Sequence, residues 1–450
     1  MTQTDLEELA GRVIKMAAEQ GATDAECTIA ESNDFSVNVR MREVETLTEA
    51  GSRGAGLRVL VGRHTGSSYT SDLTNDGLRF MVHSAMELAK ITTEDPHAGL
   101  PDREELGSLK GDLKLYSDSV PGLLAPDKIN WAKQAEAAAL DFDPRISNSE
   151  GGSFDSHTGL QVFANSRGFL SSYRYSSVSA SAVPVAKEAD EMERDYWVSS
   201  ARDTAGLEKP EEIGRRAAER TIRRLGAKKV ATQKVPIVFE PRVARSLLGD
   251  IFDAINGDAI YRHQSFLTGK LGEKIASEKV TVIDDGTIPG LFGTSPFDDE
   301  GVPSRRTVVI ERGVLKNYLL NTYTARKLGM KTTGNAARGI TGNPGISHGN
   351  FYLEAGDRTS AEIIRSIPQG FYVTELIGSG VNVVTGDYSR GAVGVWIENG
   401  ELTYPVAEVT IAGTLQEMLL GIVEIGSDLE FRSSTASPTI MVGEMTVSGQ

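Results

Sequence analysis

The sequence predicts an α+β protein in which an N-terminal α/β region of sheets and helices is followed by a β-rich C-terminal domain. Two observations predict this class. Before residue 226, apolar repeats of helical spacing alternate with strand patterns. After residue 233, alternating patterns and hairpin turns dominate and only short helices interrupt them. The chain has 450 residues, so more than one domain of roughly 100–200 residues is expected.

Residues 1–94 form the predicted N-terminal α/β subdomain. Thr4 and Glu7 have the spacing of a capping box at the start of a helix. The expected elements are a helix over 5–20, strands over 35–41 and 56–62, and a second helix over 78–91.

Residues 95–126 are predicted to be a linker, because they contain four prolines together with several glycines and charges. A central antiparallel-sheet and helix subdomain follows over 127–226. Its expected elements are a helix over 127–140, antiparallel strands over 153–203 with a turn at 165–168, and a helix over 210–225.

Residues 233–450 form the predicted β-rich C-terminal domain. Two hairpins are expected, over 308–320 with Arg312-Gly313 at the turn and over 395–406 with Asn399-Gly400. The second is the stronger signal, since a type I′ turn needs positive φ at both central residues. Short helices are expected over 244–256, 360–366 and 414–419.

Composition excludes several classes of function. The formal net charge of −15 argues against a nucleic-acid partner, because an acidic surface repels phosphates. No apolar stretch approaches the ~20 residues of a membrane span. The start of the chain is acidic rather than signal-like, and a single cysteine, Cys27, forbids an internal disulfide. We therefore expect a cytoplasmic protein and a structural thiol.

Searches for catalytic motifs give weak signals. No two of the six histidines are close enough to form a metal-binding pair on one helix face, and His83 with Glu87 is best interpreted as an exposed helical pair. The stretch 345–349, GISHG, matches the G-x-S-x-G pattern of a nucleophile elbow. It follows Asn343-Pro344 and precedes a strand-like segment, so a glycine-rich loop is favoured.

The densest acidic cluster consists of Asp298, Asp299 and Glu300. Their oxygens could hold a hard cation such as Mg²⁺ or Ca²⁺. The alternative is a charged turn with Arg305 and Arg306 as partners, and it is favoured because alternate residues of an extended segment point to opposite faces.

The predicted helix 244–256 carries two further acids. Leu247, Leu248 and Ile251 belong to its apolar stripe, whereas Asp250 and Asp253 lie off it. Both acids are expected on the exposed side of the helix, where they are either solvated surface or the remainder of a catalytic site.

Three ordered segments resemble the TldD/PmbA family, within it the PmbA (TldE) branch. The segment 49–73 resembles its N-terminal signature, and 276–339 resembles its most specific block, with DDG, DDEGVP and TGN in order. The segment 434–440, STASPTI, resembles the PmbA tail. The resemblance covers nearly the whole chain.

The resemblance implies a subunit of a TldD/TldE-type metalloprotease, also known as the "modulator of DNA gyrase" family. Two homologous subunits pair, and the TldD-type chain carries zinc on a helical H-E-x-x-x-H with a cysteine near its C-terminus. The pair is thought to cleave unfolded peptides in an enclosed chamber.

The same resemblance places the zinc motif on the helix 244–256 of this chain. Gly249 stands at the first histidine, Asp250 at the glutamate and Ala254 at the second histidine, and residues 426–450 contain no cysteine. Losing even one ligand normally abolishes tight zinc binding. We therefore expect no catalytic residue and no metal in this chain, and zinc in a TldD-type partner.

The leading hypothesis is a non-catalytic subunit that shapes the peptide chamber, in a heterodimer with a TldD-type chain or as a homodimer in isolation. The candidate chamber residues are Asp298, Asp299, Glu300, Thr333, Gly334 and Asn335. Two alternatives remain open. One is a self-standing hydrolase with a non-zinc metal held by Asp250, Asp253 and the acids at 298–300. The other is a metal-free peptide-binding homodimer.

Overall fold

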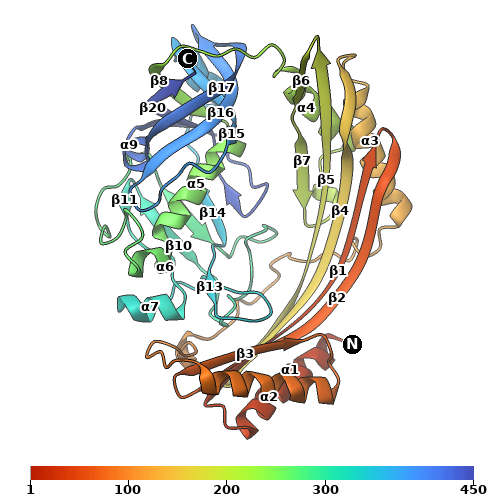
Figure 1. Ribbon diagram of the computed structural model, residues 1–450, viewed down its shortest axis with the longest axis vertical. Helices are drawn as coiled ribbons and strands as arrows, with labels where there is room; N and C mark the ends of the chain where they lie inside the picture. The colour runs from red at the N-terminus through yellow and green to blue at the C-terminus, as the bar shows by residue number, and fades with distance from the viewer. Residues whose placement is uncertain (1, 450) are drawn as a thin grey trace.

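Seven strands of the N-terminal half form one antiparallel sheet in the order β3-β2-β1-β4-β5-β6, with β7 also paired to β5 (Figure 1). The structure is a computed structural model and describes residues 2–449. The strands are β1 (Asp24–Arg40), β2 (Glu43–Val61), β3 (His64–Thr70), β4 (Ile146–Asn165), β5 (Leu170–Glu188), β6 (Glu191–Arg194) and β7 (Trp197–Ala201).

Strands β1 and β4 pair along most of their length, with Cys27 opposite Ala164 and Val37 opposite Phe154. The regions 1–94 and 127–226, predicted as separate subdomains, therefore share one sheet. A pairing between residues so far apart in the chain leaves no local pattern. The predicted turn at 165–168 is confirmed, since it joins β4 to β5 and Gly168 has a positive φ.

Four helices cover one face of this sheet: α1 (Gln3–Glu19), α2 (Asn75–Ile91), α3 (Ala125–Leu140) and α4 (Pro210–Ile222). Successive strand residues alternate between faces. Cys27 of β1 packs in the core under α1 and α2, and Val37 packs in the core under α3 and α4. Both residues have odd numbers, so all four helices lie on the same side, and the opposite face is left for the C-terminal half.

The predicted capping box of α1 is wrong by two residues. The Thr2 side chain accepts the N–H of Asp5, and the Asp5 carboxylate accepts the N–H of Thr2 at 2.7 Å. Thr4 and Glu7 have the same spacing but lie inside the helix, which begins at Gln3.

The C-terminal half contains two main sheets. The first has the order β17-β16-β15-β8-β20-β18, and an additional β17–β20 pairing closes five of its strands into a ring. Its strands are β8 (Gln233–Phe239), β15 (Gln369–Ile377), β16 (Asp387–Glu398), β17 (Glu401–Thr414), β18 (Ile422–Ile425) and β20 (Ile440–Ser448).

The second sheet has the order β11-β10-β9-β14-β19. Its strands are β9 (Val282–Asp285), β10 (Arg306–Glu311), β11 (Val314–Leu315), β14 (Asn350–Leu353) and β19 (Thr435–Ala436), and β12 (Ala336–Ala337) pairs separately with β13 (Gly345–Ile346). The α+β class is confirmed. Both predicted hairpins are also confirmed, since Arg312, Gly313, Asn399 and Gly400 all have positive φ.

Short helices complete the C-terminal half: α5 (Pro241–Ile255), α6 (Gly257–Tyr261), α7 (Thr322–Leu328), α8 (Ser360–Arg365) and α9 (Leu415–Leu420); two 3₁₀ turns, η1 (Arg103–Glu105) and η2 (Thr204–Gly206), lie earlier in the chain. The predicted apolar stripe of α5 is confirmed: Leu247, Leu248 and Ile251 are buried in the main core. Within residues 2–449, no helix combines the length and the apolar character needed to cross a bilayer.

A buried ion-pair cluster joins the two halves. Glu26 of β1 is fully buried, and its Oε1 accepts Nη1 of Arg58 at 2.7 Å and Nη1 of Arg338, from the C-terminal half, at 2.5 Å. Beside it, Ile340 lies so close to β2 that a Cβ on Gly56 would stand 1.5 Å from the Ile340 carbonyl oxygen.

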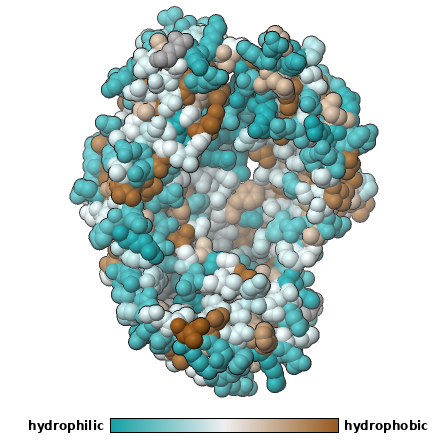
Figure 2. All heavy atoms as spheres, in the orientation of Figure 1, coloured by the Kyte–Doolittle hydropathy of each residue, from teal (hydrophilic) through white to brown (hydrophobic). Residues whose placement is uncertain are grey.

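The segment predicted as a linker forms hydrogen bonds with both halves. The N–H of Gly107 donates to the carbonyl of Gly301, and the carbonyl of Leu115 accepts the N–H of Ser176. Residues 95–124 therefore lie against both halves. Figure 2 shows the surface recessed between them, so the molecule has a hollow with one wall from each half.

Replacing Gly56 with Ala should destabilise the protein by about 3 kcal/mol, because the added methyl meets backbone that cannot move aside. Gly11→Ala is the control: Gly11 is exposed in α1 with open space around it, and this change should stabilise by roughly 0.5–1 kcal/mol. Chemical denaturation measures both. A Gly56→Ala variant as stable as the parent would contradict the close approach of Ile340.

Candidate functional site

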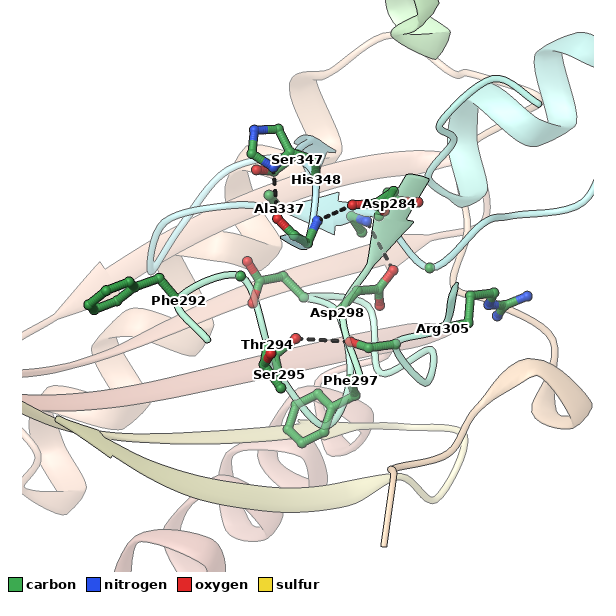
Figure 3. A pocket seen from close by; sticks show the side chains of 18 of the residues that line it. Asp284, Phe292, Thr294, Ser295, Phe297, Asp298, Arg305, Ala337, Ser347 and His348 are labelled. Carbon is green, nitrogen blue, oxygen red and sulfur yellow. Dashed lines mark hydrogen bonds between the residues drawn. The ribbon is translucent and has the colours of Figure 1, made fainter. Parts of the chain in front are cut away.

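A cavity of about 350 Å³ lies between the two halves (Figure 3). The N-terminal sheet contributes β4 and β5, and the C-terminal half contributes the end of β9 and the loops after it. The lining residues that carry polar or aromatic side chains are Gln161, Tyr173, Tyr175, Arg202, Asp284, Phe292, Thr294, Ser295, Phe297, Asp298, Asp299, Ser304, Arg305, Asn335, Ser347 and His348.

The wall from the N-terminal sheet follows from strand alternation. Even-numbered residues of β5 such as Val178 pack under the helices, so Tyr173 and Tyr175 project from the other face into the cavity. The Tyr173 hydroxyl donates to Gln161 Oε1 at 3.2 Å, and Gln161 Nε2 donates to Asp299 Oδ1 at 2.9 Å. The two walls are thus hydrogen-bonded across the cavity.

The predicted acidic cluster separates into three different environments. Asp298 accepts the backbone N–H groups of Glu300, Val302 and Ala336. Burial raises its pKa, the neighbouring Glu300 raises it further, and the backbone hydrogen bonds act in the opposite direction. Asp298 therefore closes a turn and links it to β12, as the charged-turn interpretation predicted.

Asp299 and Glu300 accept different donors from those of Asp298, because the segment turns here and its residues do not alternate as in a strand. Asp299 accepts Gln161 and, through Oδ2, the N–H of Arg338 at 2.8 Å. Glu300 is buried outside the cavity lining and accepts the N–H of Thr322 at the start of α7 at 2.9 Å. Arg305 lines the cavity, but neither it nor Arg306 pairs with these acids among the ion pairs of residues 2–449.

Two of the three predicted loop residues line the cavity. Gly334 and Asn335 do, whereas Thr333 lies behind them and donates its hydroxyl to Asn335 Oδ1 at 2.7 Å. Asn335 is buried, and its Nδ2 donates to Asp284 Oδ2 at 2.7 Å.

Asp284 is the ionisable residue that sequence reasoning missed. Its carboxylate also accepts the N–H of Gly349 at 2.6 Å. Burial raises its pKa to about 7, although the hydrogen bonds from Asn335 and Gly349 oppose the rise. The available signal was the pair Asp284-Asp285 at the end of an apolar strand, where an acid faces the interior.

His348 connects the cavity to helix α5. Its Nδ1 lies 2.8 Å from the Gly349 carbonyl oxygen, and its ring stacks edge-on against Phe252 of α5 with centroids 4.9 Å apart. Burial lowers its pKa, which favours the neutral imidazole. The GISHG stretch forms β13 and a loop that leads into β14, so it is not a nucleophile elbow.

The three motif positions of α5 lie in different environments. A Cβ on Gly249 would have open space around it, whereas Ala254 is fully buried. Asp253 is exposed, as predicted. The expectation of an exposed Asp250 is wrong: this side chain is partly buried, and its Oδ2 has no hydrogen-bond partner.

The burial of Asp250 has an electrostatic consequence. Burial raises its pKa to about 6, Arg390 of β16 opposes the rise, and Asp253 adds to it. Helical periodicity locates the apolar stripe of α5, but it does not reveal the burial of Asp250 or the nearby charge of Arg390.

The residues at the family's metal position do not fit zinc. Zinc sites use three or four nitrogen, sulfur or oxygen donors. Here Asp250 supplies the only donor side chain of the three motif positions. Across residues 2–449, no group of three or more His, Cys, Asp or Glu side chains is arranged to hold a metal ion. The acids at 298–300 instead bind backbone and side-chain donors.

Comparison with known proteins decides the family. Residues 25–89, 119–225 and 232–449 match the first, central and C-terminal domains of the PmbA/TldA metallopeptidases. The chain belongs to the PmbA/TldD metallopeptidase family. It is 39% identical to metalloprotease PmbA of Escherichia coli O157:H7, covering 99% of this chain and 96% of that protein.

Solved structures agree with this family. A protein of Bacteroides thetaiotaomicron described as a modulator of DNA gyrase is 30% identical, with a TM-score of 0.92 and 98% of each chain covered. TldE of Thermococcus kodakarensis has the same fold at 23% identity, with a TM-score of 0.86 over 98% of this chain and 100% of that one.

Replacing Asp250 with Asn should change how stability depends on pH. Because the folded pKa is raised to about 6, the native parent binds more protons than the unfolded chain between pH 4 and 6. The parent therefore loses stability as pH rises through this window, by at most about 1.4 kcal/mol per pH unit. Asp250→Asn removes that loss.

Urea denaturation at pH 4.5 and pH 7.5 measures the effect. The variant should gain roughly 1–2 kcal/mol over the parent between the two pH values. Asp190→Asn, in the exposed turn between β5 and β6, is the matched control. If the stability difference between the two pH values is the same for Asp250→Asn as for the parent, the Asp250 carboxylate is hydrated.

Proposed function

We propose that this chain is the non-catalytic subunit of a TldD/TldE-type metallopeptidase that processes unfolded peptides in the cytoplasm. One observation carries the proposal: the helix that corresponds to the family's zinc motif offers a single donor side chain, Asp250, between Gly249 and the buried Ala254. Zinc, and the activated water that attacks the peptide carbonyl, would then belong to a TldD-type partner.

The cavity between the halves suits the second part of this role, which is to hold an extended peptide. Such a peptide presents N–H and C=O groups that carboxylates, amides and hydroxyls can bind without selecting a sequence. Asp299, Gln161 and Tyr173 form a chain of such groups across the cavity, and the exposed Arg305 lies at its lining.

The alternative of a carboxylate-held metal in this chain has less support. It requires Asp250 and Asp253 to act with the acids at 298–300. Asp298 and Asp299 accept backbone N–H groups near the cavity, whereas the charged neighbours that act on Asp250 are Arg390 of β16 and Asp253, and none of the acids at 298–300 is among them. A metal-free homodimer that binds peptides remains compatible with the cavity.

The purified chain should contain substoichiometric zinc and should not cleave unfolded peptides alone, while a TldD-type subunit from the same host should become active when this chain is added. Elemental analysis and a casein-peptide cleavage assay measure these properties. Stoichiometric zinc that leaves together with activity on chelation would overturn the proposal. So would a TldD-type subunit that is equally active without this chain.

Asn335→Ala should lower peptide turnover by the mixed complex about five- to tenfold, because loss of one buried hydrogen bond to Asp284 costs about 1 kcal/mol or more and frees a carboxylate that lines the cavity. Size-exclusion chromatography should show normal assembly. Asn75→Ala, on exposed α2, is the control and should keep parental turnover. A normally assembled Asn335→Ala complex with parental turnover would place the peptide elsewhere.

A further inference from the structure

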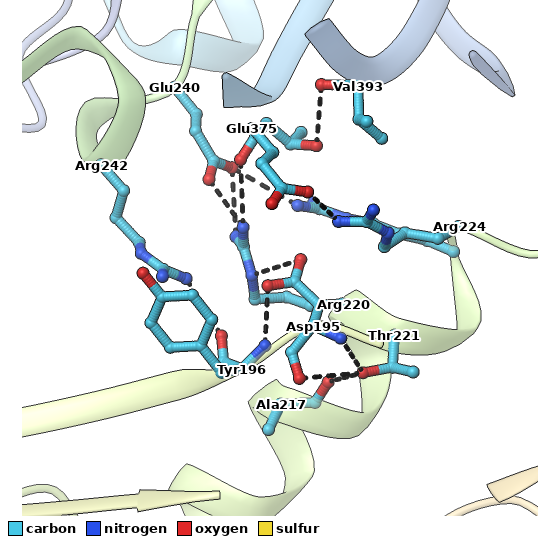
Figure 4. A network of polar contacts seen from close by, with 12 residues as sticks. Asp195, Tyr196, Ala217, Arg220, Thr221, Arg224, Glu240, Arg242, Glu375 and Val393 are labelled. Carbon is cyan, nitrogen blue, oxygen red and sulfur yellow. Dashed lines mark hydrogen bonds and ion pairs between the residues drawn. The ribbon is translucent and has the colours of Figure 1, made fainter. Parts of the chain in front are cut away.

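A second cavity of about 230 Å³ lies where α4, β7, the first turns of α5 and the segment 428–437 meet. Four arginines line it: Arg220, Arg242, Arg245 and Arg432. Figure 4 draws the polar contacts on one side of it, with Arg220 between Asp195 and Glu240 and with Arg242 lying over the Tyr196 ring.

Two of the four arginines are neutralised by carboxylates. Arg220 donates to Asp195 at 3.1 Å and to Glu240 at 2.8 Å. Arg432 pairs with Glu208 at 2.7 Å and with Glu430 at 2.9 Å. These two arginines form ion pairs across the junction between the two halves, and the carboxylates neutralise their charges.

Arg242 and Arg245 differ from Arg220 and Arg432 in their lack of a paired carboxylate within the described residues. Within residues 2–449, neither forms an ion pair, and the hydrogen bond of Arg242 goes to the Tyr196 carbonyl oxygen at 3.1 Å. The Arg242 guanidinium lies over the rings of Tyr196 and Trp197, 4.2 Å and 5.2 Å from their centroids. Burial lowers the pKa of Arg242 and the nearby charge of Arg220 lowers it further, whereas Tyr196, Glu240 and Asp195 act in the opposite direction.

The position of these two residues increases the local positive potential. They are the second and fifth residues of α5, whose N-cap Glu240 makes no side-chain cap and whose first turn contains no acid. A cation near a helix N-terminus is disfavoured by the helix dipole. The unpaired guanidiniums and the dipole therefore all favour an anion in the cavity.

The other lining residues indicate which anion fits. Glu240, Asp428 and Glu430 also line the cavity, and they would repel a phosphate dianion more strongly than a singly charged group. A guanidinium fork matches a planar carboxylate, and Pro241 and Ala436 contribute apolar side chains to the lining. The cavity therefore suits a carboxylate attached to an apolar residue.

We propose that this cavity binds the C-terminal carboxylate of a peptide, with Arg242 and Arg245 as its ligands; the proposal rests on the proposed peptide-handling function. The two cavities share a neighbour, because Thr435 lines the second cavity and its hydroxyl contacts Nε2 of His348, which lines the first. A peptide that spans both cavities would place its carboxyl end at the arginines of the second.

Calorimetric titration of the isolated full chain tests this proposal, with hexa-alanine and its C-terminal amide as probes. The free acid should bind at least tenfold more tightly than the amide. Arg245→Gln should reduce the preference to less than threefold, Arg245→Lys should restore part of it, and Arg365→Gln, on exposed α8, should leave it unchanged. Thermal unfolding confirms that each variant is folded.

Three outcomes would overturn the proposal: equal binding or no binding of the two peptides, a preference that survives in Arg245→Gln, or displacement of hexa-alanine by inorganic phosphate at lower concentration than by acetate. The last would identify a phosphate site instead. These measurements use the chain without a partner, so they are independent of whether it activates a TldD-type subunit. A carboxylate preference without such activation would refute the metallopeptidase role and leave the site intact.

Discussion

The rest of the structure depends on the buried ion pairs that bind Glu26 to Arg58 and Arg338. Burial alone would raise the pKa of Glu26, but the two guanidiniums outweigh it and the pKa lies below its ordinary value of 4.5. The stabilisation is therefore present above this value and is lost as the pH falls through the lowered pKa. Removing one partner of such a cluster leaves an uncompensated charge, at a cost of roughly 3–5 kcal/mol. The cluster also fixes the position of residues 336–338. Because the backbone N–H groups of Ala336 and Arg338 donate to Asp298 and Asp299, the position of this cavity wall depends on the ion pairs of Glu26.

A second group of buried charges closes the other end of the hollow. Arg220 of α4 reaches Glu240 at the start of α5, and Arg224 reaches Glu193 of β6 and Glu375 of β15. Ion pairs at both ends and the segment 95–124 along the side hold the two halves at several separate points. Opening the hollow by a hinge would have to break one of these buried clusters. The two cavities therefore lie beside the contacts that hold the two halves together.

The sequence predicted what local chemistry determines. Asn399-Gly400 specifies its hairpin by backbone conformation, and the stripe through Leu247 and Ile251 specifies the buried side of α5. It could not predict what depends on distant partners. Tyr173 of β5 and Asp284 of β9 line one cavity although they belong to different sheets, and the pKa of Asp250 depends on its burial and on Arg390, which is distant in the chain. The family block correctly indicated four residues that line the cavity, namely Asp298, Asp299, Gly334 and Asn335. Two others from the same block, Glu300 and Thr333, do not line it and instead form hydrogen bonds with the backbone of Thr322 and the side chain of Asn335.

Helix α5 has a buried apolar side and a flank that carries Asp250. Its apolar side fills the main core, and Phe252 supports His348 at the cavity. These contacts place the helix in the fold without a metal ion. The opposite flank has open space at Gly249 and an unpaired, half-buried carboxylate at Asp250, which lowers stability at neutral pH. A carboxylate with a raised pKa and a free oxygen beside an opening is a poor structural element, and nothing in the packing of α5 requires it. The core packing of α5 includes Ala254, whereas Gly249 and Asp250 lie on its less buried flank, so the place of the helix in the fold is set by its apolar side.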